Sequence, residues 1–188
     1  MLPNSEFKTI QEQVPDYDNL SDDAKKTIES GKYDLIFLDL RMNGVAEEDT
    51  FRPEEFSGMK ILKAIKEQNK GNQVIMFTAS NKAWNMKALL DAGADGYYIK
   101  ESPEYVFPAS YSDSNARELY DSIVSCFCNG YLRNVYSKIK KIKKKIQDSQ
   151  CFANRTDEVL GSIDIAYDLL AKSNANQEYK AYSYLQLF

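Results

Sequence analysis

Three polar residues stand at the ends of three short apolar runs in the first hundred residues of the sequence. Asp39 closes YDLIFLD (33–39), Thr78 lies near the end of QVIMFTA (73–79), and Lys100 closes ADGYYIK (94–100). Runs of this composition are typical of strands that are buried on both faces. Alone, each of the three is a common cap, strand or surface residue. On three successive strands, they predict a shared site.

The chemistry of that site follows from where parallel strands end. The carboxyl ends of parallel strands meet at one edge of a sheet, and neighbouring strands lie about 4.8 Å apart. A carboxylate, a hydroxyl and an ammonium group would therefore converge there. This set suits phosphoryl transfer, with the carboxylate attacking phosphorus while the hydroxyl and the ammonium contact the phosphoryl oxygens.

Helices are predicted between these strands, so the sequence indicates an α/β fold. Ser57 is the expected N-cap of one helix, Gly93 is expected to end another, and Gly31 a third. The first hundred residues then read β-α-β-α-β-α-β, which predicts four parallel strands joined by right-handed crossovers. The predicted strands cover 6–14, 33–39, 73–79 and 94–100, and the predicted helices cover 21–31, 57–69 and 81–92.

Beyond Pro108 the pattern predicts helices alone. Residues 114–147 form a long helical stretch with a kink or break at Gly130, and its second half carries a heptad-like apolar seam that needs a partner helix. Another helix is expected over 156–173, while 179–188 is aromatic-rich and fits either a helix or a strand. We therefore expect an α/β domain over 1–108 and a helical extension over 109–188, used as a hairpin for dimerisation or docking.

Composition narrows the classes of function. The 188 residues contain no histidine, which excludes Ser–His–Asp and Cys–His catalysis and imidazole metal sites within this chain. The three cysteines lack C-x-x-C spacing and are expected to be buried free thiols. No apolar run approaches the ~20 residues of a membrane span, and no signal peptide is evident, so a cytoplasmic location is expected. The net charge of −4 argues mildly against nucleic acid as a partner.

The motifs DLIFLDLRM, SGMKILKAIKE, QVIMFTAS and ALLDAGADGYYIK resemble the response-regulator receiver domain of two-component signalling, over about residues 33–100. The resemblance implies a flavodoxin-like parallel sheet. It implies that Asp39 is the phosphoacceptor, that Thr78 and Lys100 contact the phosphoryl group, and that Tyr97 is the aromatic switch residue. Asp39 and the backbone carbonyl of Arg41 would bind Mg²⁺. The implied partner is a sensor histidine kinase or a phosphotransfer protein of a phosphorelay.

The sequence departs from the family at its start, because the family's first strand and helix have no counterpart. That strand ends in the acidic pair that holds Mg²⁺, whereas Asp22 and Asp23 here open a helix and suit its dipole. Mg²⁺ binding is therefore expected to be poor, which predicts slow phosphorylation or a degenerate receiver acting through protein contacts. The chain is a truncated form of a longer protein, or another segment or subunit fills the gap; residues 179–188 are one candidate.

Two smaller departures lie near the expected site. Lys100 is followed by Glu101 and Ser102, where the family usually has proline. An acidic insertion, VAEEDTFRPEEF (45–56), follows the strand that ends at Asp39. This insertion either gates the site or contacts a partner, or it is a tolerated surface loop.

Two other functions remain as alternatives. The run KIKKIKKK (Lys138–Lys145) carries six lysines that could grip DNA or RNA phosphates, although such a run is more often the solvated face of a helix. An aspartate-nucleophile phosphatase would need Asp-x-Asp, but Arg41 stands two residues after Asp39. We therefore expect a protein that is not an enzyme, with a homodimer or a helical partner protein as its contact.

Overall fold

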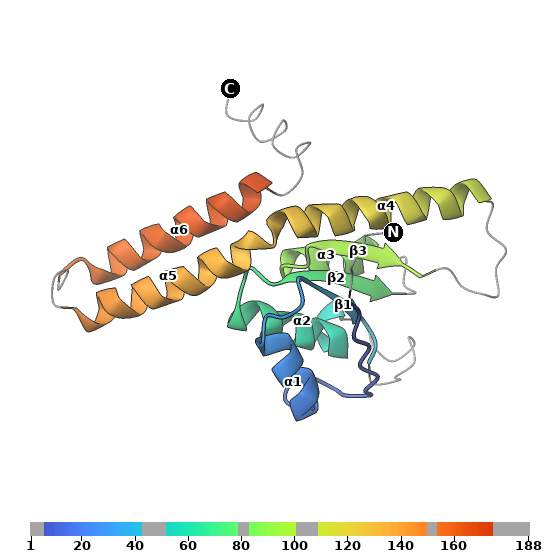
Figure 1. The fold of residues 1–188 in the computed structure, drawn as a ribbon, viewed down its shortest axis with the longest axis horizontal. Coiled ribbons are helices and arrows are strands. Elements are labelled where there is room, and N and C mark those ends of the chain that lie inside the picture. Colours follow the sequence, from blue (N-terminus) through green and yellow to red (C-terminus); the bar gives the residue numbers. More distant parts are fainter. Residues whose placement is uncertain (1–5, 43–51, 79–82, 101–108, 150–153, 175–188) are drawn as a thin grey trace, which may run out of the picture.

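The structure is a computed structural model that describes residues 6–42, 52–78, 83–100, 109–149 and 154–174. An α/β unit is followed by long helices, and the last two of these form a hairpin that projects from the body (Figure 1). Along the chain the elements are α1 (Asp22–Glu29), β1 (Leu35–Asp39), a 3₁₀ turn (Pro53–Glu55), α2 (Ser57–Gln68), β2 (Gln73–Thr78), α3 (Ala83–Asp91), β3 (Gly96–Ile99), α4 (Ala109–Asn129), α5 (Tyr131–Asp148) and α6 (Thr156–Asn174).

The described sheet has three parallel strands in the order β1-β2-β3. Leu35 pairs with Gln73 at one end, and Thr78 pairs with Ile99 at the other. The parallel α/β architecture and the helical C-terminal region predicted from the sequence are confirmed.

The expectation of a fourth strand over 6–14 is wrong for the described residues. This segment carries no strand pairing, and its anchors are of another kind. Lys8 Nζ lies 2.7 Å from an Asp23 carboxylate oxygen on α1, and the Val14 N–H donates to the Met42 carbonyl at 3.0 Å. An alternating pattern makes a strand only where a neighbouring strand lies within hydrogen-bonding distance, and the described chain places none there.

Helices cover both faces of the sheet. On one face α4 contacts all three strands (Figure 1). A Cβ placed on Gly96 would lie 3.0 Å from Cγ1 of Ile75 on β2, a tight contact, and 3.4 Å from the Ser122 side chain of α4, an ordinary packing distance. On the other face, α2 and α3 contribute to the hydrophobic core, whose fully buried side chains include Leu62, Ile65 and Leu89, with Val74 and Met76 of β2.

The helix boundaries follow from local chemistry with one correction. Ser21 caps α1, because its Oγ accepts the Ala24 N–H, and Asp22 and Asp23 lie in the first turn as expected for the helix dipole. Gly31 has φ +64°, a conformation that favours glycine, just after that helix. Ser57, however, is not the N-cap of α2. Phe56 holds that position, and the Ser57 hydroxyl bonds elsewhere.

The long helical stretch divides at Gly130 into α4 and α5. The partner that the apolar seam of α5 requires is α6: the Tyr136 and Tyr167 rings lie 5.0 Å apart, and Lys143 Nζ is 2.6 Å from an Asp164 carboxylate oxygen. The seam is covered only in part, since Ile142 remains 50% exposed. The division into domains at 108/109 stays a prediction, and residues 179–188 lie outside the described residues.

Two of the three cysteines can be placed. Cys126 is buried against the sheet, where desolvation raises the pKa of its thiol to about 12, so it remains a protonated core side chain. Cys128 is exposed, which corrects the expectation of buried thiols, because it lies on the outer face of α4. Within the described ranges, no helix has an apolar stretch long enough to cross a bilayer.

An ion pair joins α2 to the loop before β3, at the amino-terminal edge of the sheet. Lys66 Nζ lies 2.6 Å from Asp95 Oδ2, and their side chains are 10% and 26% exposed. Lys66 also donates to the Asn72 carbonyl, and Asp95 Oδ2 accepts the Val74 N–H at 2.7 Å. Burial raises the pKa of Asp95, and the ammonium of Lys66 opposes that rise. Lys66 therefore favours the ionised form of the Asp95 carboxyl group.

Replacing Lys66 with methionine is expected to lower the free energy of unfolding at neutral pH by roughly 2 kcal/mol, between the effects of breaking an exposed and a buried pair. Without Lys66 the pKa of Asp95 rises further. The cost should therefore shrink as the pH falls and Asp95 takes up a proton. Denaturant titration of both proteins at neutral and acidic pH measures this, with the exposed Lys63→Met of the same helix as control. An equal cost at both pH values would contradict this role.

Candidate functional site

The residues predicted to act together lie at the carboxyl edge of the sheet. Asp39 and Thr78 are the last residues of β1 and β2, and Lys100 follows the last residue of β3. Two backbone hydrogen bonds hold these ends together: the Leu40 N–H donates to Phe77 O at 3.0 Å, and the Lys100 N–H donates to Thr78 O at 2.7 Å. The strand pairing, rather than the side chains themselves, thus places all three at one edge.

Asp39 and Lys100 form a direct ion pair across the width of the sheet. Lys100 Nζ lies 2.6 Å from Asp39 Oδ2, and the side chains are 40% and 43% exposed, respectively. The other carboxylate oxygen accepts the Arg41 N–H at 3.3 Å. Both oxygens of Asp39 therefore face donors. An ion pair with this exposure contributes about 0–1 kcal/mol to stability, so it can open without disturbing the sheet.

Thr78 and Tyr97 lie on the opposite face of the sheet from Asp39. The Thr78 side chain is almost fully buried, while Tyr97 is half-buried and packs against the hydrophobic core. Burial raises the pKa of Tyr97, and a side-chain hydrogen bond with Thr78 opposes that rise. Thr78 and Tyr97 are thus in contact, so a movement of one side chain would affect the other. Their role as a switch stays a prediction.

The described residues at this edge do not fit an Mg²⁺ site. Mg²⁺ requires near-octahedral oxygen ligands, usually including one or two carboxylates. The described residues contain no group of three metal-ligating side chains, and the Asp39 carboxylate already pairs with Lys100. The guanidinium of Arg41 extends away, 5.7 Å from the centre of the Phe56 ring. The described residues therefore add no further side-chain ligands to the predicted Mg²⁺ site on Asp39 and the Arg41 carbonyl.

Two residues that sequence analysis did not assign to the site hold the backbone after Asp39. The Ser57 hydroxyl, at the start of α2, accepts the Met42 N–H at 2.7 Å, and the Gly58 N–H donates to Leu40 O at 3.0 Å. A Cβ on Gly58 would lie 2.2 Å from the Asp39 carbonyl oxygen, so only glycine fits. The Ser-Gly pair at the start of an apolar helix was the available signal. The same pattern is also typical of a helix cap.

The basic run Lys138–Lys145 lies far along α5, on the projecting hairpin and away from this site (Figure 1). Most of its lysines are exposed, but two contribute to the fold. Lys143 pairs with Asp164 of α6, and Lys140 Nζ donates to the Gln68 carbonyl at 3.2 Å. Glu101, Ser102 and most of the acidic insertion lie outside the described residues, apart from 52–56 at its end.

Comparisons with a family model and with curated proteins both find similarity to response regulators. The model of the family described as the response regulator receiver domain matches residues 13–107, slightly more than half of the chain. The nitrate/nitrite response regulator protein NarP of Escherichia coli K12 is 34% identical over 101 residues, which are 53% of this chain and 40% of NarP. A nitrate/nitrite response regulator protein homolog of Haemophilus influenzae is 32% identical over 69 residues, 37% of this chain and 28% of that protein. The chain thus spans less than half the length of these relatives.

Proposed function

Because this chain belongs to the response-regulator receiver family, we propose that it is a receiver module of a two-component system that signals through protein contacts. Asp39 occupies its phosphate-accepting position. The observation that carries the proposal is the 2.6 Å ion pair between Asp39 and Lys100 at the carboxyl edge of the sheet. In this proposal the Asp39–Lys100 ion pair holds the site in one conformation, and partner proteins bind the surface around it.

The same contacts determine what chemistry the site supports. For phosphorylation, an oxygen of Asp39 would attack phosphorus while the donor's leaving group departs. Lys100 would have to leave that oxygen and neutralise the phosphoryl oxygens, and Thr78 would have to turn its hydroxyl outward from a buried position. Asp39 is the carboxylate that the described chain offers there, so few carboxylate ligands would hold a divalent cation beside the dianionic phosphoryl group. Phosphorylation is therefore expected to be slow.

Incubation with acetyl phosphate and Mg²⁺ tests this expectation. We expect little or no phosphate on the protein over the time in which a receiver with a complete acidic site is fully modified, as measured by intact-protein mass spectrometry. Asp39→Asn is the control, because it keeps the size of the side chain but removes the nucleophile. Rapid Mg²⁺-dependent incorporation into the unaltered chain that disappears in Asp39→Asn would overturn the proposal in favour of an active phosphoacceptor.

The α5–α6 hairpin is the surface that we propose for output. Ile165 and Leu169 lie one turn apart on α6 and are more than 60% exposed, while Ile142 of α5 is half exposed. Exposed apolar side chains on a projecting hairpin suit contact with another helix. Lys140 and Lys143 already bind groups within the fold, which favours a protein partner over nucleic acid. A sensor histidine kinase remains the proposed upstream partner, and the proposal does not involve an enzymatic activity.

A further inference from the structure

The described sheet has two edge strands, β1 and β3, and the edge on β1 adjoins a groove. Within the described chain, β1 pairs with β2 alone. The Leu40 N–H points to β2, and since successive residues of a strand bond to alternate sides, the backbone groups of Ile36 and Leu38 also face β2. Those of Leu35 and Phe37 face the other way. An edge with such free backbone groups is a template for another strand.

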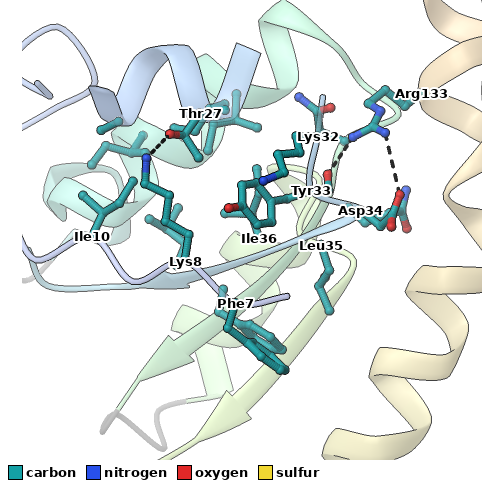
Figure 2. A pocket seen from close by; sticks show the side chains of 18 of the residues that line it. Phe7, Lys8, Ile10, Thr27, Lys32, Tyr33, Asp34, Leu35, Ile36 and Arg133 are labelled. Atoms are coloured by element: carbon teal, nitrogen blue, oxygen red, sulfur yellow. Dashed lines mark hydrogen bonds and ion pairs between the residues drawn. The ribbon is translucent and has the colours of Figure 1, made fainter. Parts of the chain in front are cut away.

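A groove of about 610 Å³ lies along this edge. Phe7, Lys8 and Ile10 of the N-terminal segment line one side of it, and Leu35 and Ile36 of β1 line the other (Figure 2). The floor and walls are mainly apolar and come from α1 and the residues just before it, from α2 and from α4, with Leu20, Ala24, Ile61, Ile65, Ile123 and Phe127 among them. Phe37 remains 41% exposed here although it lies in the sheet.

The shape of the groove limits what can occupy it. A second copy pairing its own β1 edge would have to approach past the segment 6–10, which lies along the opposite side of the groove (Figure 2). A single extended segment meets no such obstacle. It would lie between two extended stretches of chain and offer hydrogen bonds to β1. A strand buried on both faces must be almost continuously apolar and free of charge.

We propose that residues 181–188 of this chain, AYSYLQLF, occupy the groove as a strand parallel to β1. These eight residues carry no charged side chain. They extend over about 26 Å at ~3.3 Å per residue, more than the length of the five-residue β1. They also contain no carboxylate side chain, so they would complete the sheet without supplying ligands for a metal at Asp39.

The path of α6 sets the direction of this strand. Asp168 of α6 lies 3.4 Å from Lys70, which precedes the first residue of β2 by three positions, and Tyr167 packs on Tyr136 of α5. The last turns of α6 therefore pass the amino-terminal end of the sheet. Six residues separate Asn174 from Ala181, and a linker of that length spans about 20 Å when extended. A chain entering the groove from this end runs in the same direction as β1.

Amide hydrogen exchange on the full chain tests the proposal, with Leu185→Asp plus Leu187→Asp as the variant. We expect the Leu35 and Phe37 amides to exchange at least about tenfold faster in the variant, because both lose their hydrogen-bond acceptors. The Ile36 and Leu38 amides, which bond to β2, should stay protected. The matched control, Asn176→Asp plus Gln177→Glu, adds the same two charges in the linker and should leave all four amides unchanged.

Other outcomes would overturn the proposal. Equal exchange of Leu35 and Phe37 in the wild type and the variant would mean that this segment does not cover the edge. Protection that increases with protein concentration would assign the edge to a second copy. If the double substitution also exposes Ile36 and Leu38, the milder Leu187→Ser decides by the same comparison: selective loss at Leu35 and Phe37 supports the proposal, and no selective loss overturns it.

Discussion

Replacing Gly58 with alanine is expected to lower the free energy of unfolding by about 3 kcal/mol, at the upper end of the cost of inserting a methyl group into a packed site. The added Cβ would lie 2.2 Å from the Asp39 carbonyl oxygen and 2.7 Å from Leu40 Cα. Both are backbone atoms at the end of a paired strand, so neither can move away as a side chain would. The start of α2 or the end of β1 must shift instead.

Denaturant titration measures the effect, and Gly161→Ala is the matched control. Gly161 lies within α6, where a Cβ would meet nothing within 4 Å. The same chemical change there should stabilise the protein by about 0.5–1 kcal/mol, because alanine favours the helix. If Gly58→Ala behaved like Gly161→Ala, α2 would not press against the strand that ends at Asp39.

Replacing Ile65 with alanine is expected to cost about 2–5 kcal/mol, because it removes three methyl or methylene carbons from a side chain that the core surrounds completely. Ile65 of α2 is 0% exposed and packs in the core beneath β1 and β2. It also lines the groove beside the open edge, so its loss would weaken both the core and the wall of the groove.

The identical substitution at Ile165 provides the comparison. Ile165 of α6 is 62% exposed, and truncating it should change the unfolding free energy by no more than about 0.5 kcal/mol. Thermal or denaturant unfolding of the two variants, measured side by side, separates buried from exposed apolar surface. Similar losses at both positions would indicate that the face of α6 bearing Ile165 is covered in solution.

Much of the α/β unit was predictable because its signals are local. The apolar runs that end at Asp39 and at Thr78 form β1 and β2 within a residue or two of the expected bounds. Ser21 and Gly31 delimit α1 as their capping chemistry requires. These elements depend on residues that are neighbours in the sequence, so pattern and propensity are enough to identify them.

The failures involve residues that are distant in sequence. The alternation in 6–14 predicted a strand, but a strand also needs a neighbour with which to pair, and the pattern does not supply one. Ser57 looked like a helix cap because Ser is a good one. Its hydroxyl instead binds the Met42 N–H, fifteen residues earlier in the chain. Cys128 was expected inside, and the rotation of α4 about its axis places it outside.

The sequence by itself determined which residues stand at the strand ends, since Asp39, Thr78 and Lys100 each lie at or near the end of a short apolar run whose length and composition favour a strand. The tertiary structure alone decided what these residues contact. Lys100 reaches Asp39 across 61 positions of sequence because β2 lies between their strands and aligns the three ends. The open edge of β1 was decided in the same way, because hydrogen bonding between strands depends on which segments become neighbours in space.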